Sequence, residues 1–402
     1  MIKQVQHIVV DADRARYAGH PRQGGIFDFG DGEIAVLYNR APCAYQKQTD
    51  VQHDFHGYHM RSQVILARSF DSGVTWDRAN DVVVFDQTMA EPDRIAFIEQ
   101  AASGREIARE SIDLNAPDAA IFFGRTFVSD GTEDGFNTIS FALRSADKGH
   151  TWESVPTKLQ PRISGASVHK DAHPLVTMPD GTHLGAMSHG GSPPHVDPVI
   201  GAISQNPNVS LYGSDDHGLT WEPISIICND PTGIGRATYA ALILLPSSRL
   251  QCYTLNIGGL RDAIQMCHSD DGGYSWSTPE PIVRWGRSPW ARRARQHAVT
   301  GQGAFGKFHR SPWPIRLADG RIVVLFGRRK PPYGMGLILS EDDGDTWSDQ
   351  QIIRDDASGP DLAYPVALET APGRIFTAYY YMLDDGNGFG GTRFIAGSHI
   401  DL

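Results

Sequence analysis

Short apolar runs separated by turn residues recur along the whole chain. In five places, two such runs flank a turn rich in Gly, Pro, Asp or Ser. These pairs occupy residues 25–38, 173–187, 239–255, 313–326 and 364–381. Runs of this length, bounded by turn residues, predict β-hairpins. A more degenerate hairpin near 118–128 brings the set to six, so we expect an all-β chain of six repeated units.

A second pattern, S-x-D-x-G-x-[TS]-W, follows all but the last of these hairpins. It begins at Ser69, Ser145, Ser214, Ser269 and Ser340. Its Asp can accept hydrogen bonds from backbone N–H groups of its own turn, its Gly permits a positive φ, and its Trp brings apolar surface to bury. We therefore predict a tight turn that joins the third strand of each unit to the fourth. The alternative, a Ca²⁺ loop, needs further acidic ligands that the pattern lacks.

Through this box the chain resembles the Asp-box, or bacterial neuraminidase repeat, proteins of the sialidase superfamily. The resemblance spans residues 69–347 and implies a six-bladed β-propeller with four-stranded blades. The last unit has no box and ends in TRFIAGSHIDL. We expect the N-terminal segment QVQHIVV, residues 4–10, to add its outer strand and close the ring. No linker interrupts the pattern, so we expect residues 1–402 to form a single domain.

Composition narrows the range of partners. The formal net charge of −11 argues against nucleic acid or an anionic membrane as the main partner. No signal-peptide pattern and no membrane-spanning run is seen, which favours a cytoplasmic protein. The four cysteines, Cys43, Cys228, Cys252 and Cys267, lack metal-motif spacing, and we expect reduced thiols. We expect neither a cofactor nor a bound metal.

The candidate site lies where the innermost strands of a propeller begin, because residues just before those strands converge on one mouth. Arg22, Arg236 and Arg310 precede or open three of the predicted hairpins. Three guanidinium groups facing one axis repel each other unless an anion lies between them. Sialidases hold their substrate carboxylate with an arginine triad and carry a catalytic tyrosine on the sixth blade. The resemblance thus implies that these arginines bind a sugar carboxylate and that Tyr364 is the nucleophile.

The resemblance also implies an acid/base aspartate in the loop after the first hairpin, where this chain offers Asp50 and Asp54. Around the first arginine, the family signature F-R-I-P is replaced by HPRQG. Ordinary glycosidases use two carboxylates, and the tyrosine route is a known exception. The first hypothesis is therefore an exo-acting, sialidase-like glycoside hydrolase that acts on a carboxylated sugar such as sialic acid.

Histidines at the same entry points suggest a second chemistry. His169, Asp171 and His173 alternate, so on a strand they share one face and could bind substrate or a metal, or supply a base with its orienting carboxylate. The second hypothesis is a lyase that cleaves uronate-containing glycans. Its base comes from His169, His173 or His309, with Tyr239 or Tyr364 assisting. A third is a non-catalytic glycan-binding propeller, since a fold does not determine a function.

Overall fold

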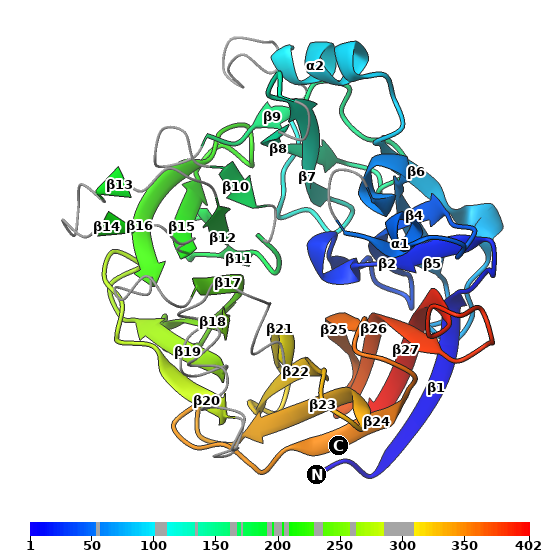
Figure 1. Cartoon of the computed structure of the whole chain (residues 1–402). Helices are drawn as coiled ribbons and strands as arrows, with labels where there is room; N and C mark the ends of the chain where they lie inside the picture. Colours follow the sequence, from blue (N-terminus) through cyan, green and yellow to red (C-terminus); the bar gives the residue numbers. More distant parts are fainter. Residues whose placement is uncertain are drawn as a thin grey trace.

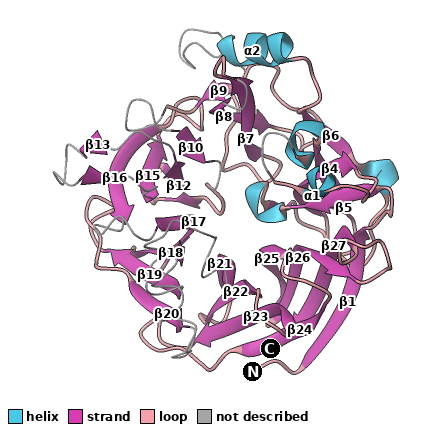
Figure 2. Cartoon of the chain, in the orientation of Figure 1, coloured by secondary structure: helices cyan, strands magenta, loops and turns pink. Residues whose placement is uncertain are grey.

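Six antiparallel β-sheets stand around a common hub in the computed structural model (Figure 1). The structure describes residues 1–53, 57–100, 111–132, 136–160, 167–169, 172–190, 195–196, 203–204, 209–228, 236–257, 263–284 and 309–402. The helices α1 (Gln48–Val51) and α2 (Glu91–Glu99) and the 3-10 turns η1 (Pro21–Gln23), η2 (Tyr58–Arg61) and η3 (Arg78–Asn80) belong to the first two blades (Figure 2). The expected six-bladed β-propeller is confirmed.

Within each blade the strands follow chain order from hub to rim, except that the N-terminal strand β1 joins the rim of blade 6. Blade 1 holds β2 (Arg16–Gly19), β3 (Ile26–Asp28), β4 (Ile34–Pro42), β5 (Gln63–Ser69) and β6 (Val82–Asp86). Blade 2 holds β7 (Ala120–Ser129), β8 (Phe136–Ser145) and β9 (Thr157–Lys158). Blade 3 holds β10 (Ser167–His169), β11 (Val176–Thr177), β12 (His183–Gly190), β15 (Val209–Ser214) and β16 (Glu222–Cys228), and β13 (His195–Val196) pairs with β14 (Ile203–Ser204) between them.

The remaining three blades have four strands each. Blade 4 holds β17 (Arg236–Leu244), β18 (Leu250–Ile257), β19 (Ala263–Ser269) and β20 (Glu280–Arg284). Blade 5 holds β21 (His309–Arg316), β22 (Ile322–Arg328), β23 (Tyr333–Ser340) and β24 (Gln351–Ala357). Blade 6 holds β25 (Ala363–Ala371), β26 (Arg374–Leu383), β27 (Thr392–Asp401) and β1 (Gln4–Asp11).

The N-terminal strand closes the ring as predicted. β1 pairs antiparallel with β27, with Val5 opposite Ile400, so the two ends of the chain share one sheet (Figure 1). The Asp11 carboxylate at the end of β1 accepts hydrogen bonds from Tyr38 of β4, at 2.8 Å, and from Arg78 after β5, at 2.7 Å. The closing strand is therefore fastened to blade 1 as well as to blade 6.

Blade 2 differs from the expectation. The degenerate hairpin expected near 118–128 is not a hairpin: β7 is one continuous strand that pairs along its whole length with β8. The described part of blade 2 is a three-stranded sheet, and α2 lies in the stretch of chain that precedes β7. The helix α2 therefore lies at the place in the sequence where the other blades have their first strand.

The five boxes are turns between the last two strands of their blades. In four blades these are the third and fourth strands, as expected, and in the three-stranded described part of blade 2 they are β8 and β9. In the first box, Asp71 accepts hydrogen bonds from the Thr75 backbone N–H at 2.8 Å and the Thr75 hydroxyl at 2.6 Å. The Trp76 indole donates to the Gly73 carbonyl at 2.9 Å. The boxes at Ser145, Ser214, Ser269 and Ser340 repeat the carboxylate contacts. The box carboxylate therefore serves its own turn, as predicted.

Each box also contacts the blade before it. Trp76 of blade 1 stacks on Phe376 of blade 6, with ring centroids 5.7 Å apart. Trp221 of blade 3 lies 5.3 Å from Phe123 of blade 2, and Trp347 of blade 5 lies 6.0 Å from Tyr253 of blade 4. The apolar core is accordingly divided among the spaces between neighbouring sheets. The repeated motif joins one blade to the next.

We expect the G273A substitution to destabilise the propeller by about 2–4 kcal/mol, because Gly273 has φ +95° and a Cβ there would overlap Leu211 of the preceding blade. The matched control is G272A. Gly272 also has positive φ, but its nearest neighbour would be 3.9 Å away, and Ser72, Lys148, His217 and Asp343 occupy this position in the other boxes with φ of 53° to 60°. Urea unfolding measures the difference, and equal losses for both variants would contradict the inter-blade contact.

Candidate active site

The inner strands of blades 4, 5 and 6 each begin with a β-bulge. The pairing register shifts between Thr238 and Ala241, between Arg310 and Trp313, and between Ala363 and Val366. Within these bulges, Tyr239, Ser311 and Tyr364 have φ of 54°, 34° and 54°. Non-glycine residues in this region cost about 1–3 kcal/mol each, and such strain concentrates at functional sites, where a bulge re-aims a side chain.

The bulges bring two tyrosines together. The hydroxyl oxygens of Tyr239 and Tyr364 lie 2.6 Å apart, and their rings meet edge to face at 5.1 Å. The guanidinium carbon of Arg310 lies 5.6 Å from the centre of the Tyr239 ring and 5.8 Å from that of Tyr364. Tyr364 and Arg310 are buried, and Tyr239 is half-buried. Three of the residues singled out in the sequence therefore meet at the hub, each from a different blade.

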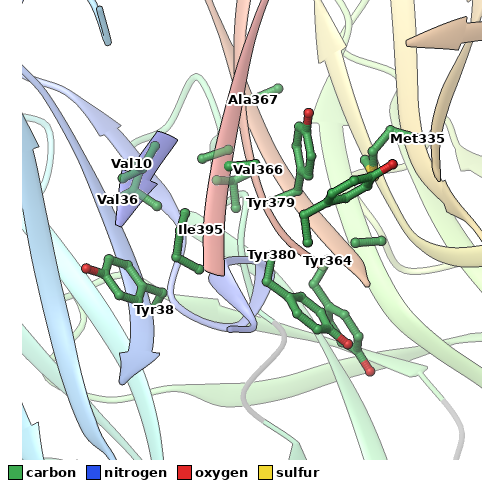
Figure 3. Close-up of a cluster of buried hydrophobic side chains, with 14 of the residues drawn as sticks. Val10, Val36, Tyr38, Met335, Tyr364, Val366, Ala367, Tyr379, Tyr380 and Ile395 are labelled. Carbon is green, nitrogen blue, oxygen red and sulfur yellow. The ribbon is translucent and has the colours of Figure 1, made fainter. Parts of the chain in front are cut away.

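A carboxylate, Asp361, organises the side chains next to this pair. It accepts hydrogen bonds from the Tyr380 hydroxyl at 2.7 Å and from Arg393 Nε at 2.9 Å. Arg329 donates to the Tyr380 hydroxyl at 2.9 Å, and its guanidinium carbon lies 5.8 Å from the centre of the Tyr364 ring. Figure 3 shows that Tyr364 and Tyr380, from adjacent strands, extend their hydroxyl groups in the same direction, opposite to Tyr379.

Burial and neighbouring charges determine the protonation of Asp361 and Tyr380. Burial alone raises the pKa of a carboxyl group, but His53 and Arg393 hold the pKa of Asp361 well below its ordinary value. Burial, with the charge of Asp361 second, raises the pKa of Tyr380 well above that of a free tyrosine. Asp361 is therefore an anion and an acceptor at neutral pH, whereas Tyr380 stays protonated and donates.

A His–Tyr cluster (Tyr17, His20, His53 and Tyr58) covers the other side of Tyr364. The His20 ring lies 4.6 Å from the Tyr364 ring, and its Nδ1 is hydrogen-bonded to the Tyr58 hydroxyl. Burial, and secondly the charge of His53, lowers the pKa of His20 well below its ordinary value, so His20 is a neutral imidazole. His53 Nε2 lies 2.7 Å from the Tyr17 hydroxyl and 3.4 Å from Asp361.

Arg22 and His173 are two further buried side chains at the hub, and Arg22 lies against the inner strands of blades 4 and 5. Arg22 is fully buried; it donates to the Ala240 carbonyl, and its guanidinium carbon lies 5.1 Å from the centre of the Trp313 ring. His173 Nε2 lies 3.0 Å from the Ile121 carbonyl, and His173 lines a pocket of about 270 Å³ together with Trp313 and Phe27. Burial first, and the Arg22 charge second, lower the pKa of His173 to about 4.

The other sequence candidates are placed as follows. Asp50 is buried in α1 and accepts hydrogen bonds from the backbone N–H groups of Gln46, at 2.9 Å, and Lys47, at 3.2 Å. His309 opens β21 and is buried, with its ring 5.6 Å from Phe326. The backbones of Arg236 and His169 lie in β17 and β10, but their side chains are outside the described part. Asp54 and Asp171 lie outside the described residues.

The alternating trio was expected to share one strand face. In the structure β10 ends at His169, and His173 follows it after a break in the described chain, so the two histidines do not belong to one described strand. Sequence reasoning also missed Asp361, Arg329, Tyr380 and Arg393. One available signal was the acid three positions before Tyr364 in the segment PDLAY.

Metal and membrane features can be assessed for the described ranges alone. Within them, no group of three or more His, Cys, Asp or Glu side chains is arranged to hold a metal ion. All four cysteines are free and buried, with Cys252 opposite Cys267 on adjacent strands. No helix in this part of the chain is long and apolar enough to cross a membrane.

The fold and its five boxes define a six-bladed β-propeller with Asp-box turns. The sequence pattern of the BNR repeat-like domain matches residues 114–377. Because this match covers more than half of the chain, the protein belongs to the BNR repeat-like domain family. A comparison with curated protein sequences gave no match.

Solved structures share this architecture at low sequence identity. A protein of unknown function from Dyadobacter fermentans is 18% identical, with a TM-score of 0.70 over 100% of both chains. The GH93 α-L-arabinofuranosidase of Fusarium graminearum is 14% identical, with a TM-score of 0.58 over 98% of this chain and 97% of that one. A Hadza microbial sialidase is 15% identical, with a TM-score of 0.55 over 96% of this chain and 66% of that one. These likenesses show the fold.

We expect His173 to remain neutral down to about pH 4, and to make the protein less stable as the pH falls from about 6.5. Because the folded pKa lies below the unfolded one, only the unfolded state takes up the proton in this window, which costs on the order of 3 kcal/mol of stability. The test compares urea unfolding at pH 7 and pH 4.5 for wild type and H173Q. H268Q, on the half-exposed blade-4 histidine, is the control, and an unchanged pH dependence in H173Q would contradict the assignment.

Proposed function

We propose that the protein is a glycoside hydrolase that acts on a sugar bearing a carboxylate, with its reaction centre at Tyr239, Arg310 and Tyr364. The observation that carries this proposal is the pair of tyrosine hydroxyls at 2.6 Å beside the Arg310 guanidinium. The family and the hydrolase neighbours are consistent with sugar chemistry on this fold. The proposed substrate class and the proposed residue roles are argued from the geometry and charges of the site.

The tyrosine pair can supply a nucleophile. When two coupled phenols lose one proton, the remaining proton is shared between their oxygens, and the single negative charge belongs to the pair. Arg310 and Arg329 lie close enough to the Tyr364 ring to stabilise that charge. The Tyr364 oxygen then attacks the anomeric carbon. A phenol suits an anionic sugar, because before ionisation it does not repel the substrate carboxylate as an aspartate would.

The balance of charge favours an anionic ligand. Around the Tyr364 and Tyr380 rings, the described charges are the guanidinium groups of Arg310, Arg329 and Arg393 and the carboxylate of Asp361. This local excess of positive charge occurs in a chain whose formal net charge is −11. In the proposal, Arg310 binds the sugar carboxylate together with Arg236, which opens the neighbouring strand β17.

A second candidate function is elimination from a uronate-containing glycan. The observation that favours it is the His–Tyr cluster beside Tyr364, whose partly exposed member, His53, can act as a base toward a proton next to a carboxylate. Elimination leaves an unsaturated product that absorbs in the ultraviolet, whereas hydrolysis leaves none. A screen of sialosides, related keto-acid glycosides and uronate oligosaccharides separates the two reactions. Binding without turnover would instead favour a glycan-binding propeller.

We expect Y364F to lower kcat/KM for a turned-over acidic glycoside by about 10³-fold or more, because the variant lacks the attacking oxygen. R310M should chiefly raise KM, because it removes the cation that holds the carboxylate. The matched control is Y379F: Tyr379 lies on β26, points away from Tyr364 in Figure 3 and bonds Ser398 at 2.6 Å. Steady-state kinetics with a fluorogenic substrate gives both parameters. Near wild-type activity of Y364F would contradict the proposal.

A further inference from the structure

We propose that His53 is the general acid of this hydrolysis, and that Asp361 is the positioning residue that orients it. The inference rests on the proposed function and assigns the role for which Asp50 and Asp54 were considered. It rests on the hydrogen bonds of His53, on its exposure within a buried cluster, and on its position relative to Tyr364.

The hydrogen bonds fix the orientation of His53. Its Nε2 lies 2.7 Å from the Tyr17 hydroxyl and 3.4 Å from Asp361, and the Tyr17 hydroxyl itself donates to Asp361 at 3.3 Å. This pattern places Nε2–H toward Tyr17 and the carboxylate. The other ring nitrogen, Nδ1, is therefore the atom that can exchange a proton with a ligand. A carboxylate that orients an imidazole in this way is a recurring arrangement in acid–base catalysis.

Asp361 is itself firmly held. Tyr380 and Arg393 donate to it at 2.7 Å and 2.9 Å, and Arg393 also donates to the carbonyls of Phe389 and Gly391. These contacts fix the carboxylate in position and, as shown above, keep it ionised. A carboxylate fixed at this place holds the His53 ring in one orientation, with Nε2 toward Asp361 and Nδ1 away from it.

Exposure distinguishes His53 from its neighbours. Its side chain is 33% exposed, whereas Tyr17, Tyr58 and His20 are at most 2% exposed. His53 is thus the member of the His–Tyr cluster that a ligand can reach. Its ring lies 4.8 Å from the His20 ring, which in turn lies 4.6 Å from Tyr364. His53 and Tyr364 therefore both lie next to the His20 ring.

Several polar and aromatic groups face His53. They are the carboxylate of Asp361, the hydroxyl of Tyr17, and the rings of His20, Tyr58 and His59. The positive charges of Arg393 and Arg329 interact with Asp361. Tyr17 and Tyr58 have pKa values raised well above the ordinary range by burial, so they stay neutral. Asp361 is therefore the negative charge that His53 directly faces.

The proposed step conserves protons and electron pairs. The cycle starts with the tyrosine pair as a single anion, after one of its protons has been released to water. The imidazolium gives its Nδ1 proton to the glycosidic oxygen as the bond from that oxygen to the anomeric carbon breaks and the Tyr364 oxygen bonds to that carbon. The neutral His53 then takes a proton from water, whose oxygen bonds to the anomeric carbon as the bond to Tyr364 breaks. Tyr364 and the protonated His53 are both restored.

The test compares two substrates that carry the same acidic sugar, one with a 4-methylumbelliferyl leaving group and one with an alkyl alcohol. A phenolic leaving group departs without protonation, but an alkoxide needs an acid. We expect H53Q to lose about 10²–10³-fold in kcat on the alkyl glycoside and less than tenfold on the aryl glycoside. The glutamine side chain of this variant retains an N–H that can bond Asp361, so the cluster is preserved. H268Q is the matched histidine control and should match wild type on both substrates.

The ratio of the two substrates tests the role of Asp361. In D361N, kcat on the alkyl glycoside should fall further than kcat on the aryl glycoside, because the amide holds the imidazole less firmly in the orientation that protonates an alkoxide. D356N is the matched control, since Asp356 bonds Arg354 at 2.8 Å and Tyr381 at 2.9 Å. Its alkyl-to-aryl ratio should match that of the wild type.

The outcomes separate this inference from the proposed function. Wild-type hydrolysis with H53Q equally impaired, or equally active, on both substrates would contradict the role of His53 and leave the hydrolase standing. An unchanged alkyl-to-aryl ratio in D361N would contradict the role of Asp361. If the wild type hydrolyses neither substrate, nor any other acidic glycoside in the screen, the hydrolase proposal fails, and the general acid fails with it.

Discussion

The contact between each Asp-box and the preceding blade is the constraint on which the rest of the structure depends. A four-stranded sheet cannot bury both of its faces alone, so each blade needs a neighbour on either side. The box meets this need with one turn, in which the carboxylate orders the backbone, the glycine allows close approach and the tryptophan packs against the preceding sheet. Trp76 makes this contact with Phe376 across the point where the ring closes, and β1 seals the same point by hydrogen bonding.

In a ring built in this way, the inner strands can tolerate strained backbone conformations. Their rim-side neighbours supply the packing, so the first residues of β17, β21 and β25 can bulge without loss of the sheet. The bulges turn Tyr239 and Tyr364 toward each other and place Arg310 beside both. Rigid blades thus position three side chains that are far apart in the sequence, which is the precision that catalysis requires.

The architecture could be predicted from the sequence because short local patterns determine its turns and strands. Hairpin turns, boxes and the unpaired segment 4–10 are each short, and each one has a single structural solution. Tyr364, Tyr239 and Arg310 were recognisable because they stand at the entries to inner strands. Asp361, Arg329 and Arg393 were not, because they meet only after the blades have closed, and nothing in the local sequence of Arg393 marks it as the partner of Asp361. The prediction for blade 2 was wrong because the segment interpreted as a hairpin near 118–128 forms a single ten-residue strand, β7.

The two sides of the candidate site differ because of where the Asp361 carboxylate lies. Had Asp361 bonded Tyr364, it would have faced the carboxylate of an acidic sugar at close range and repelled it. It bonds Tyr380, Arg393 and Tyr17 instead, and the oxygen of Tyr364 is left with a neutral phenol and two nearby guanidinium groups. The negative charge of Asp361 thereby lies beside His53 and not at the Tyr364 hydroxyl. One buried anion held by arginine is enough to make the two halves of the site chemically different.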